Sequence, residues 1–143
     1  MRIDSRLSRM LHVLLHMAYH DRPLSSEQIA SMLETNPVVV RRTMAGLRKA
    51  GYVRSVTGRG GGWSISCDLK TTTLLDVHRA VGGSHVFAIG VDNPHPNCAV
   101  ERGVNMALKD ALQKAEALLI ERLGQVTLAD IAVNFASLCR AGA

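Results

Sequence analysis

Apolar residues recur every three to four positions through most of the first fifty residues, which is the period of α-helices with one buried face. The first such stripe covers residues 7–18, and Ser5 is its expected N-cap. A second helix begins at Ser25 and Gln28, which have the spacing of a capping box, and ends near Leu33. The pattern therefore predicts two helices joined by a short loop.

A third helix begins at Asn36 and Pro37, an N-cap followed by proline in the first helical position. The residues expected on its buried side are Val40, Met44 and Leu47. The arginines at positions 41, 42 and 48 lie largely off that side. Gly51 supplies the left-handed residue that ends the helix.

The hydrophobic period then changes to two. Residues 52–56 and 63–67 have the pattern of two strands, and the glycine-rich segment 57–62 between them forms a hairpin tip that carries Arg59. The order helix, short helix, turn, helix, hairpin is that of a winged helix-turn-helix. The sequence therefore predicts a mainly α fold with a two-stranded β wing.

The second half of the chain returns to a helical pattern. A short helix capped by Thr73 is followed by a loop over residues 84–97 and by a long helix over residues 99–123, which Gly124 is expected to close. Thr127 caps a last, short helix. The apolar stripe of the long helix consists of Val100, Val104, Ala107, Leu108, Ala111, Ala115, Leu118 and Leu119.

Charge separates the two halves. Residues 1–60 hold ten lysines and arginines against four acidic residues, a net charge of +6, whereas residues 61–143 hold seven against eight, a net charge of −1. A basic half beside a neutral half indicates a polyanion-binding unit joined to a unit with another task. We therefore divide the chain into a DNA-binding domain over residues 1–70 and a helical dimerisation and sensing region over residues 71–143.

Composition excludes several classes of protein. Hydrophobic residues make up 47% and charged residues 20%, as in ordinary globular proteins. The chain has no apolar run long enough to span a membrane, and its N-terminus lacks the pattern of a signal peptide. Three dispersed cysteines do not make a disulfide scaffold, so we expect a cytoplasmic protein. With no nucleophile–base pair, paired carboxylates or cofactor loop, we expect neither an enzyme nor a cofactor.

The helix-turn-helix lets its second helix, here about residues 37–50, lie in the major groove of double-stranded DNA. Arg41 and Arg42 lie one turn into that helix, where an arginine can bind guanine or a phosphate; a solvated charged face is the alternative. Arg59 on the glycine-rich tip can enter a narrow minor groove. A nucleotide-binding loop is disfavoured because the spacing and the following helix are missing.

Three segments together resemble a known family: the opening residues 1–5, the turn at residues 47–53 and the wing at residues 55–63. They are similar to the Rrf-type bacterial winged-helix transcription regulators, the family of IscR-, NsrR- and CymR-like proteins. The resemblance implies a homodimer that binds a palindromic operator, usually as a repressor, and that pairs through the long helix near residues 99–123. The long apolar stripe agrees, since so small a chain has little else to cover it.

The resemblance also implies which residues contact DNA. They are Ser5, Arg6, Ser26, Asn36, Val38, Val39, Arg41, Arg42, Arg48, Thr57, Gly58, Arg59, Gly60 and Gly61. Ser5, Arg6 and Arg48 would meet phosphates, and Arg59 with its glycines would form the minor-groove wing. Thr57 departs from the many relatives that carry a basic residue there, which leaves Arg59 as the charged side chain of the tip.

Cluster-binding relatives place three cysteines in the loop before the long helix, whereas this loop holds Cys98 alone. An atypical iron–sulfur site would need His85, His95 or the partner subunit, and we expect no metal site. Cys98 is instead a candidate sensing thiol, because a helix N-terminus lowers a thiol pKa. Arg102 would add to that effect and Glu101 would oppose it. An inert cysteine kept for packing is the alternative.

Two further readings stay open. The winged helix could serve as an adaptor that binds a protein partner, or the chain could be an iron–sulfur sensor with unusual ligands. His12, His16 and His20 lie on one face of the first helix, where we expect a partly exposed stripe rather than a metal site.

Overall fold

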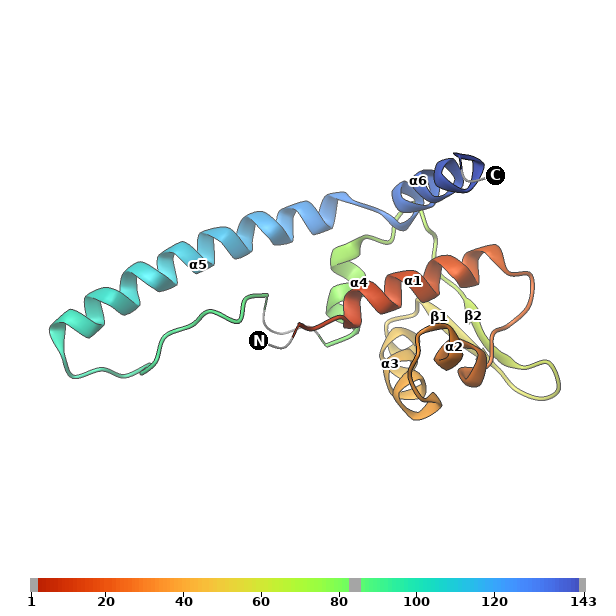
Figure 1. The fold of residues 1–143 in the computed structure, drawn as a ribbon, viewed down its shortest axis with the longest axis horizontal. Helices are drawn as coiled ribbons and strands as arrows, with labels where there is room; N and C mark the ends of the chain where they lie inside the picture. The colour runs from red at the N-terminus through yellow and green to blue at the C-terminus, as the bar shows by residue number, and fades with distance from the viewer. Residues whose placement is uncertain (1–2, 83–85, 142–143) are drawn as a thin grey trace.

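The computed structural model describes residues 3–82 and 86–141, with the side chains of the last helix described as far as residue 134. It contains six helices and a two-stranded antiparallel sheet in that part of the chain (Figure 1). The elements are α1 (Arg6–Tyr19), α2 (Ser26–Met32), α3 (Pro37–Lys49), β1 (Val53–Val56), β2 (Gly62–Ile65), α4 (Leu74–Ala80), α5 (Ala99–Gln125) and α6 (Leu128–Ala141). The predicted fold class, a winged helix-turn-helix followed by a long helix, is confirmed.

Side-chain caps fix the start of the short helices. Ser25 and Gln28 form the predicted capping box at α2, because the Gln28 amide donates to the Ser25 hydroxyl and the Ser25 amide donates to the Gln28 side chain. Thr73 and Asp76 do the same for α4. These reciprocal bonds satisfy amides that have no acceptor inside the helix, so the ends of both short helices are well defined.

Strands β1 and β2 and the turn between them form a hairpin, which we call the wing. Val53 pairs with Ile65 and Val56 pairs with Gly62. A feature that the sequence pattern did not reveal is a bridge between β2 and the loop before α2. Leu24 and Trp63 exchange backbone hydrogen bonds of 2.9 and 2.8 Å. The wing is therefore hydrogen-bonded to the helix-turn-helix as well as covalently joined to it.

One buried cluster joins the two halves of the chain. It consists of Met10, Val13, Leu14, Met17, Leu24, Ile29, Ala30, Val40, Met44, Leu47, Val53, Trp63, Val77, Val81 and Leu128. All but one of these side chains are aliphatic or methionine, as the low aromatic content predicts. Val77 of α4 and Leu128 of α6 are fully buried in the same core as the buried residues of α3. Helices α4 and α6 therefore pack against the winged helix and stabilise it.

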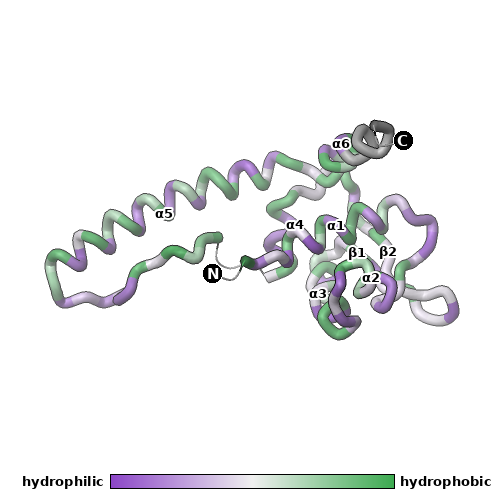
Figure 2. Tube along the Cα trace, in the orientation of Figure 1, coloured by the Kyte–Doolittle hydropathy of each residue, from purple (hydrophilic) through white to green (hydrophobic). Residues whose placement is uncertain are grey.

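Helix α5 projects away from this body (Figure 1). Apolar and polar residues alternate along it (Figure 2), and its apolar side chains are strongly exposed, with Val100 at 75% and Leu118 at 69%. The loop before it lies back on its first turns, where the buried Asn105 side chain donates to the Asn93 carbonyl at 2.8 Å.

The two last helices differ from the sequence prediction in length. Helix α5 passes through Gly124 and ends at Gln125, because Val126 becomes extended and its carbonyl accepts from the Leu74 amide at 2.9 Å. Gly124 therefore does not end the helix. The last helix is not short, since α6 continues to Ala141. No helix among the described residues has the length and apolarity needed to cross a membrane.

Candidate nucleic-acid interface

Helix α3 has one buried side and one open side. Val40, Met44 and Leu47 are fully buried and fix the helix in the core. The open side carries Val38, Val39, Arg41, Arg42 and Arg48, all of which are exposed. An anchored helix with arginines and valines on its outer side has both the cations that bind phosphates and the small apolar groups that contact thymine methyls.

The N-terminus of α3 is capped by the side chain of Asn36, whose amide oxygen accepts from the Val39 N–H at 3.0 Å. Pro37 occupies the first helical position and has no N–H to satisfy. The predicted DNA contact Asn36 thus has a structural role in the free protein, and its amide nitrogen is the part left for a further contact.

The arginines of α3 differ in their surroundings. The Arg41 guanidinium lies 3.5 Å from a carboxylate oxygen of Glu27 on α2, and both side chains are exposed. Within residues 3–82 and 86–134, no such ion pair is found for Arg42, Arg48 or the wing residue Arg59. Sequence reasoning missed Glu27 because the contact depends on how α2 crosses α3.

The tip of the wing is a tight glycine turn. Gly58 and Gly60 have φ of +89° and +75°, a region that other residues rarely adopt, and the Gly61 N–H donates to the Gly58 carbonyl at 3.0 Å. Thr57, Arg59 and the two left-handed glycines are exposed. The turn therefore holds Arg59 at the extreme end of the hairpin.

The base of the wing is fixed by Trp63. Its indole N–H donates to the hydroxyl of Ser26 at 3.0 Å, and both side chains are buried. The Ser26 hydroxyl thus has a structural role in the free protein, and its O–H is the part left for the predicted DNA contact, which stays a prediction. Ser26 joins the first turn of α2 to the wing.

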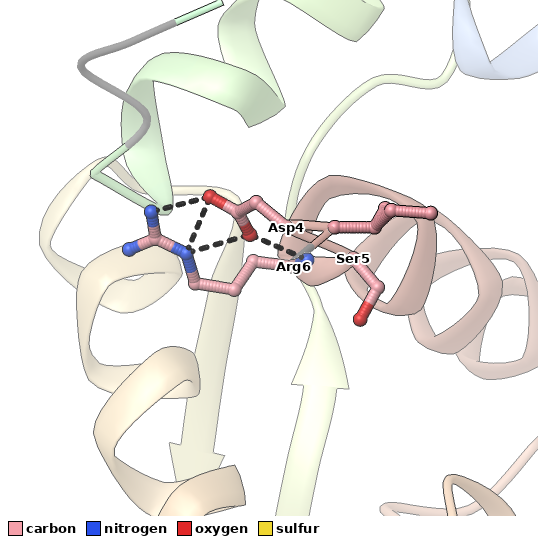
Figure 3. A pocket seen from close by; sticks show the side chains of 4 residues that line it. Asp4, Ser5 and Arg6 are labelled. Atoms are coloured by element: carbon pink, nitrogen blue, oxygen red, sulfur yellow. Dashed lines mark hydrogen bonds and ion pairs between the residues drawn. The ribbon is translucent and has the colours of Figure 1, made fainter. Parts of the chain in front are cut away.

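The start of α1 holds the other predicted phosphate contacts (Figure 3). Asp4 binds Arg6 through both carboxylate oxygens, at 2.7–3.2 Å, and these hydrogen bonds lower the pKa of Asp4 to about 2. Arg6 also donates to the Val81 carbonyl at 3.3 Å. Ser5 stands at the N-cap position but its hydroxyl makes no capping bond; the Arg6 amide donates to Asp4 instead. The remaining N–H groups of Arg6 are the part left for the predicted phosphate contact.

Cys98 occupies the N-cap of α5 and is exposed. The thiol makes no capping hydrogen bond, but the nearby backbone N–H groups of Glu101 and Val100 lower its pKa. Arg102 was expected to assist, but its guanidinium donates to the Asn97 carbonyl at 2.8 Å. The thiol therefore owes its acidity to the helix N-terminus.

The described residues do not fit an iron–sulfur cluster or a structural metal. Among them no three His, Cys, Asp or Glu side chains come together as metal ligands would. Cys67 lies partly buried beside the core, and burial raises the pKa of its thiol. His85 and the Cys139 side chain lie outside the described residues.

His12 and His16 on α1 and His20 at its C-cap lie in a row with tilted rings. The ring centroids of His12 and His16 are 4.8 Å apart, and those of His16 and His20 are 6.0 Å apart. Burial lowers the pKa of His16, and the two neighbouring histidines add to this. A partly exposed stripe is what the sequence predicted.

Comparison with known proteins shows the family to which this chain belongs. A model described as Rrf2, iron-dependent transcriptional regulator, matches residues 3–134. YwnA of Bacillus subtilis strain 168, named as an HTH-type transcriptional regulator, is 34% identical over 129 residues, covering 90% of this chain and 96% of YwnA.

Solved structures share the fold. T. potens IscR matches with a TM-score of 0.68 and 23% identity, over 94% of this chain and 88% of that one. CymR, described as the global cysteine regulator of B. subtilis, matches with a TM-score of 0.61 and 22% identity, over 94% and 98%. At these identities the likeness concerns the arrangement of helices and wing.

Proposed function

The chain belongs to the Rrf2 family of transcriptional regulators, and from that premise we propose that it is a homodimeric repressor that binds a palindromic DNA operator in the cytoplasm. The observation that carries the proposal is the anchored helix α3 with its exposed arginines beside a wing tipped by Arg59. Both lie on the side of the body opposite α6 (Figure 1). The family consists of DNA-binding regulators and not of enzymes.

In this proposal residues 1–70 form the DNA-binding domain. The open side of α3 enters the major groove, where Val38, Val39, Arg41 and Arg42 reach base edges. Ser5, Arg6 and Arg48 bind the sugar–phosphate backbone. Arg59 enters the adjacent minor groove, whose negative potential is strongest where the groove is narrow. The phosphate contacts position the protein on the duplex, and the base contacts determine which sequence it binds.

Residues 71–143 form the dimerisation and sensing region. The large apolar side chains that α5 leaves exposed favour this helix as an interaction surface. A second copy of the same helix covers that surface and places two α3 helices on the two half-sites of a palindrome. The family description names iron, but the described residues bring no three His, Cys, Asp or Glu side chains together to hold it.

Two arginine variants test the docking. Arg59→Ala should weaken binding to A·T-rich sites, and Arg41→Ala should change the preferred sequence as well as the affinity, by about 1–3 kcal/mol for a lost base contact. Duplexes selected by the wild type from a random library would be titrated by fluorescence anisotropy at several salt concentrations. Wild-type affinity should fall steeply with salt, since bound arginines release counterions.

The matched control is Lys114→Ala, which removes an exposed positive charge from α5. It should bind both duplexes as the wild type does. If Arg41→Ala and Arg59→Ala also behave as the wild type on selected and random DNA, the docking is wrong.

We further propose that Cys98 tunes DNA binding. Its lowered pKa enriches the thiolate, which peroxide oxidises to a sulfenic acid. The sulfenic acid then condenses with a second thiol to give a mixed disulfide and water. The added group lies at the N-cap of α5, where the loop of residues 86–97 joins the helix. Oxidation of Cys98 shifts the loop against α5 and thereby alters the affinity of the dimer for DNA.

Cys98→Ser should therefore remove the sensitivity of DNA binding to peroxide while leaving the affinity of the reduced protein unchanged. The measurement is a binding titration before and after peroxide treatment, with Cys67→Ser as the control, since the Cys67 thiol is partly buried and has a raised pKa. Peroxide sensitivity that survives in Cys98→Ser contradicts the switch.

A further inference from the structure

Acidic side chains lie beside two of the arginines that the proposed function assigns to DNA. Asp4 pairs with Arg6 at 2.7 Å, and Glu27 pairs with Arg41 at 3.5 Å. A carboxylate at the edge of a DNA interface repels phosphates, so its presence beside a contact residue weakens binding unless it contributes something else. The Glu27–Arg41 pair is the more informative one, because Arg41 lies on the recognition helix.

The position of Glu27 is set by rigid parts of the fold. It lies in the first turn of α2, between Ser25 and Gln28, the two residues of the capping box. Two residues farther on, Ile29 is fully buried, and on α3 the residue before Arg41, Val40, is buried as well. The backbones on both sides of the ion pair are thus anchored in the core, and the carboxylate is held within reach of Arg41 before any DNA arrives.

We propose that Glu27 is a specificity-determining residue that acts through Arg41; this inference rests on the proposed function. In the free protein a carboxylate oxygen of Glu27 lies 3.5 Å from Nη1 of Arg41, as an ion pair on one side of the guanidinium. A phosphate that binds Arg41 must approach Glu27 and is repelled by it. A guanine edge, which carries no net charge, takes the remaining donors of Arg41 without that repulsion.

Glu27 therefore weakens the binding of Arg41 to DNA phosphates more than its binding to the correct base. Its carboxylate oxygens can in addition accept from the amino group of a cytosine, which is the pairing expected of an acidic side chain in the major groove. Selectivity that comes from a repulsive element is a general device for discriminating against wrong partners.

The test is Glu27→Gln, which keeps the shape of the side chain and removes its charge. Binding would be measured across a range of KCl concentrations to two 30-base-pair duplexes, one of random sequence and one selected by the wild type from a random library. For the random duplex the variant should bind more tightly. The slope of log affinity against log salt should become more negative by about 0.9, as one added phosphate contact predicts. The ratio of selected to random affinity should fall about tenfold, within the range that one bidentate base contact provides.

Two controls separate this role from a structural one. Glu121→Gln on α5 makes the same change in net charge at an exposed position outside the winged helix and should leave the ratio unchanged. In an Arg41→Ala background, Glu27→Gln should have no further effect on the salt slope, because the residue through which it acts is gone. A melting temperature equal to that of the wild type would show that the fold is intact.

The outcomes distinguish this inference from the proposed function. If the wild type selects DNA and Glu27→Gln keeps the same ratio and salt slope, the inference is overturned and the DNA-binding function stands. If Glu27→Gln changes the ratio equally with and without Arg41, Glu27 does not act through Arg41 and the inference is again wrong. If the wild type binds no duplex selectively, both proposals fail.

Discussion

Replacing Leu118 and Leu119 with glutamate should convert the protein into a monomer and lower its affinity for a two-half-site operator by more than a hundredfold. The two side chains are 69% and 37% exposed on α5. In the proposed dimer each copy buries both, and a fully buried leucine contributes about 1.5–3 kcal/mol. A glutamate in its place must also lose its hydration.

The variant loses DNA affinity because its two DNA-binding units are no longer joined. When two recognition units are joined, the second binds at a high effective concentration, which raises the overall affinity by about 10²–10⁴ without a new contact. Sedimentation equilibrium would give the oligomeric state, and anisotropy titrations on full and half sites would give the two affinities. Half-site binding should be nearly unchanged, because α3 and the wing are untouched.

The control for this variant is Gln113→Glu, an exposed polar position of the same helix outside the predicted apolar stripe. It should remain a dimer. Circular dichroism would confirm that α5 stays helical in both variants. A Leu118→Glu/Leu119→Glu protein that sediments as a dimer at micromolar concentration would show that the copies pair elsewhere.

Replacing Gly62 with alanine should lower the free energy of unfolding by about 3 kcal/mol or more, the size expected when backbone strain is combined with lost hydrogen bonds. Gly62 has φ of +147°, and a Cβ there would lie 2.5 Å from the Leu24 carbonyl oxygen and 2.9 Å from the Ser25 nitrogen. Both neighbours are backbone atoms and cannot turn away. The hydrogen bonds between Leu24 and Trp63 must therefore lengthen or break.

Urea unfolding followed by the fluorescence of Trp63 measures this loss, since Trp63 is the single tryptophan of the chain. Gly58→Ala is the matched control: its φ is +89°, but nothing lies within 4 Å of the added Cβ. It should cost about 1 kcal/mol, the conformational penalty alone. Equal losses in the two variants would mean that contact with Leu24 does not matter.

Local patterns predicted the elements well because the signals that form them are local. Asn36 followed by Pro37 marks the start of α3, and Ser25 with Gln28 marks α2, since each cap is completed within three residues. Gly51 has the predicted left-handed conformation for the same reason. The apolar stripe of α5 was visible as well, and its exposure in a single chain fits the expectation of a partner helix.

Contacts between distant segments could not be predicted in this way. Ser26 was assigned to DNA by resemblance, but its environment is decided by Trp63, which lies 37 residues away. Glu27 went unnoticed because its partner is on another helix. Gly124 has the residue type of a helix end, yet Val126 sets the end by pairing with Leu74. Each case depends on tertiary structure, which overrides a local preference.

The bridge between Thr73 and Thr127 determines how α5 can move. It ties the start of α4 to the start of α6, so the C-terminal end of α5 is fastened to the body while Cys98 lies at the opposite end of the helix. A helix of 27 residues is about 40 Å long at ~1.5 Å per residue. Helix α5 is thus a lever with its pivot at the body, and a rotation of about 5° at the pivot displaces the Cys98 end by about 3–4 Å over that length.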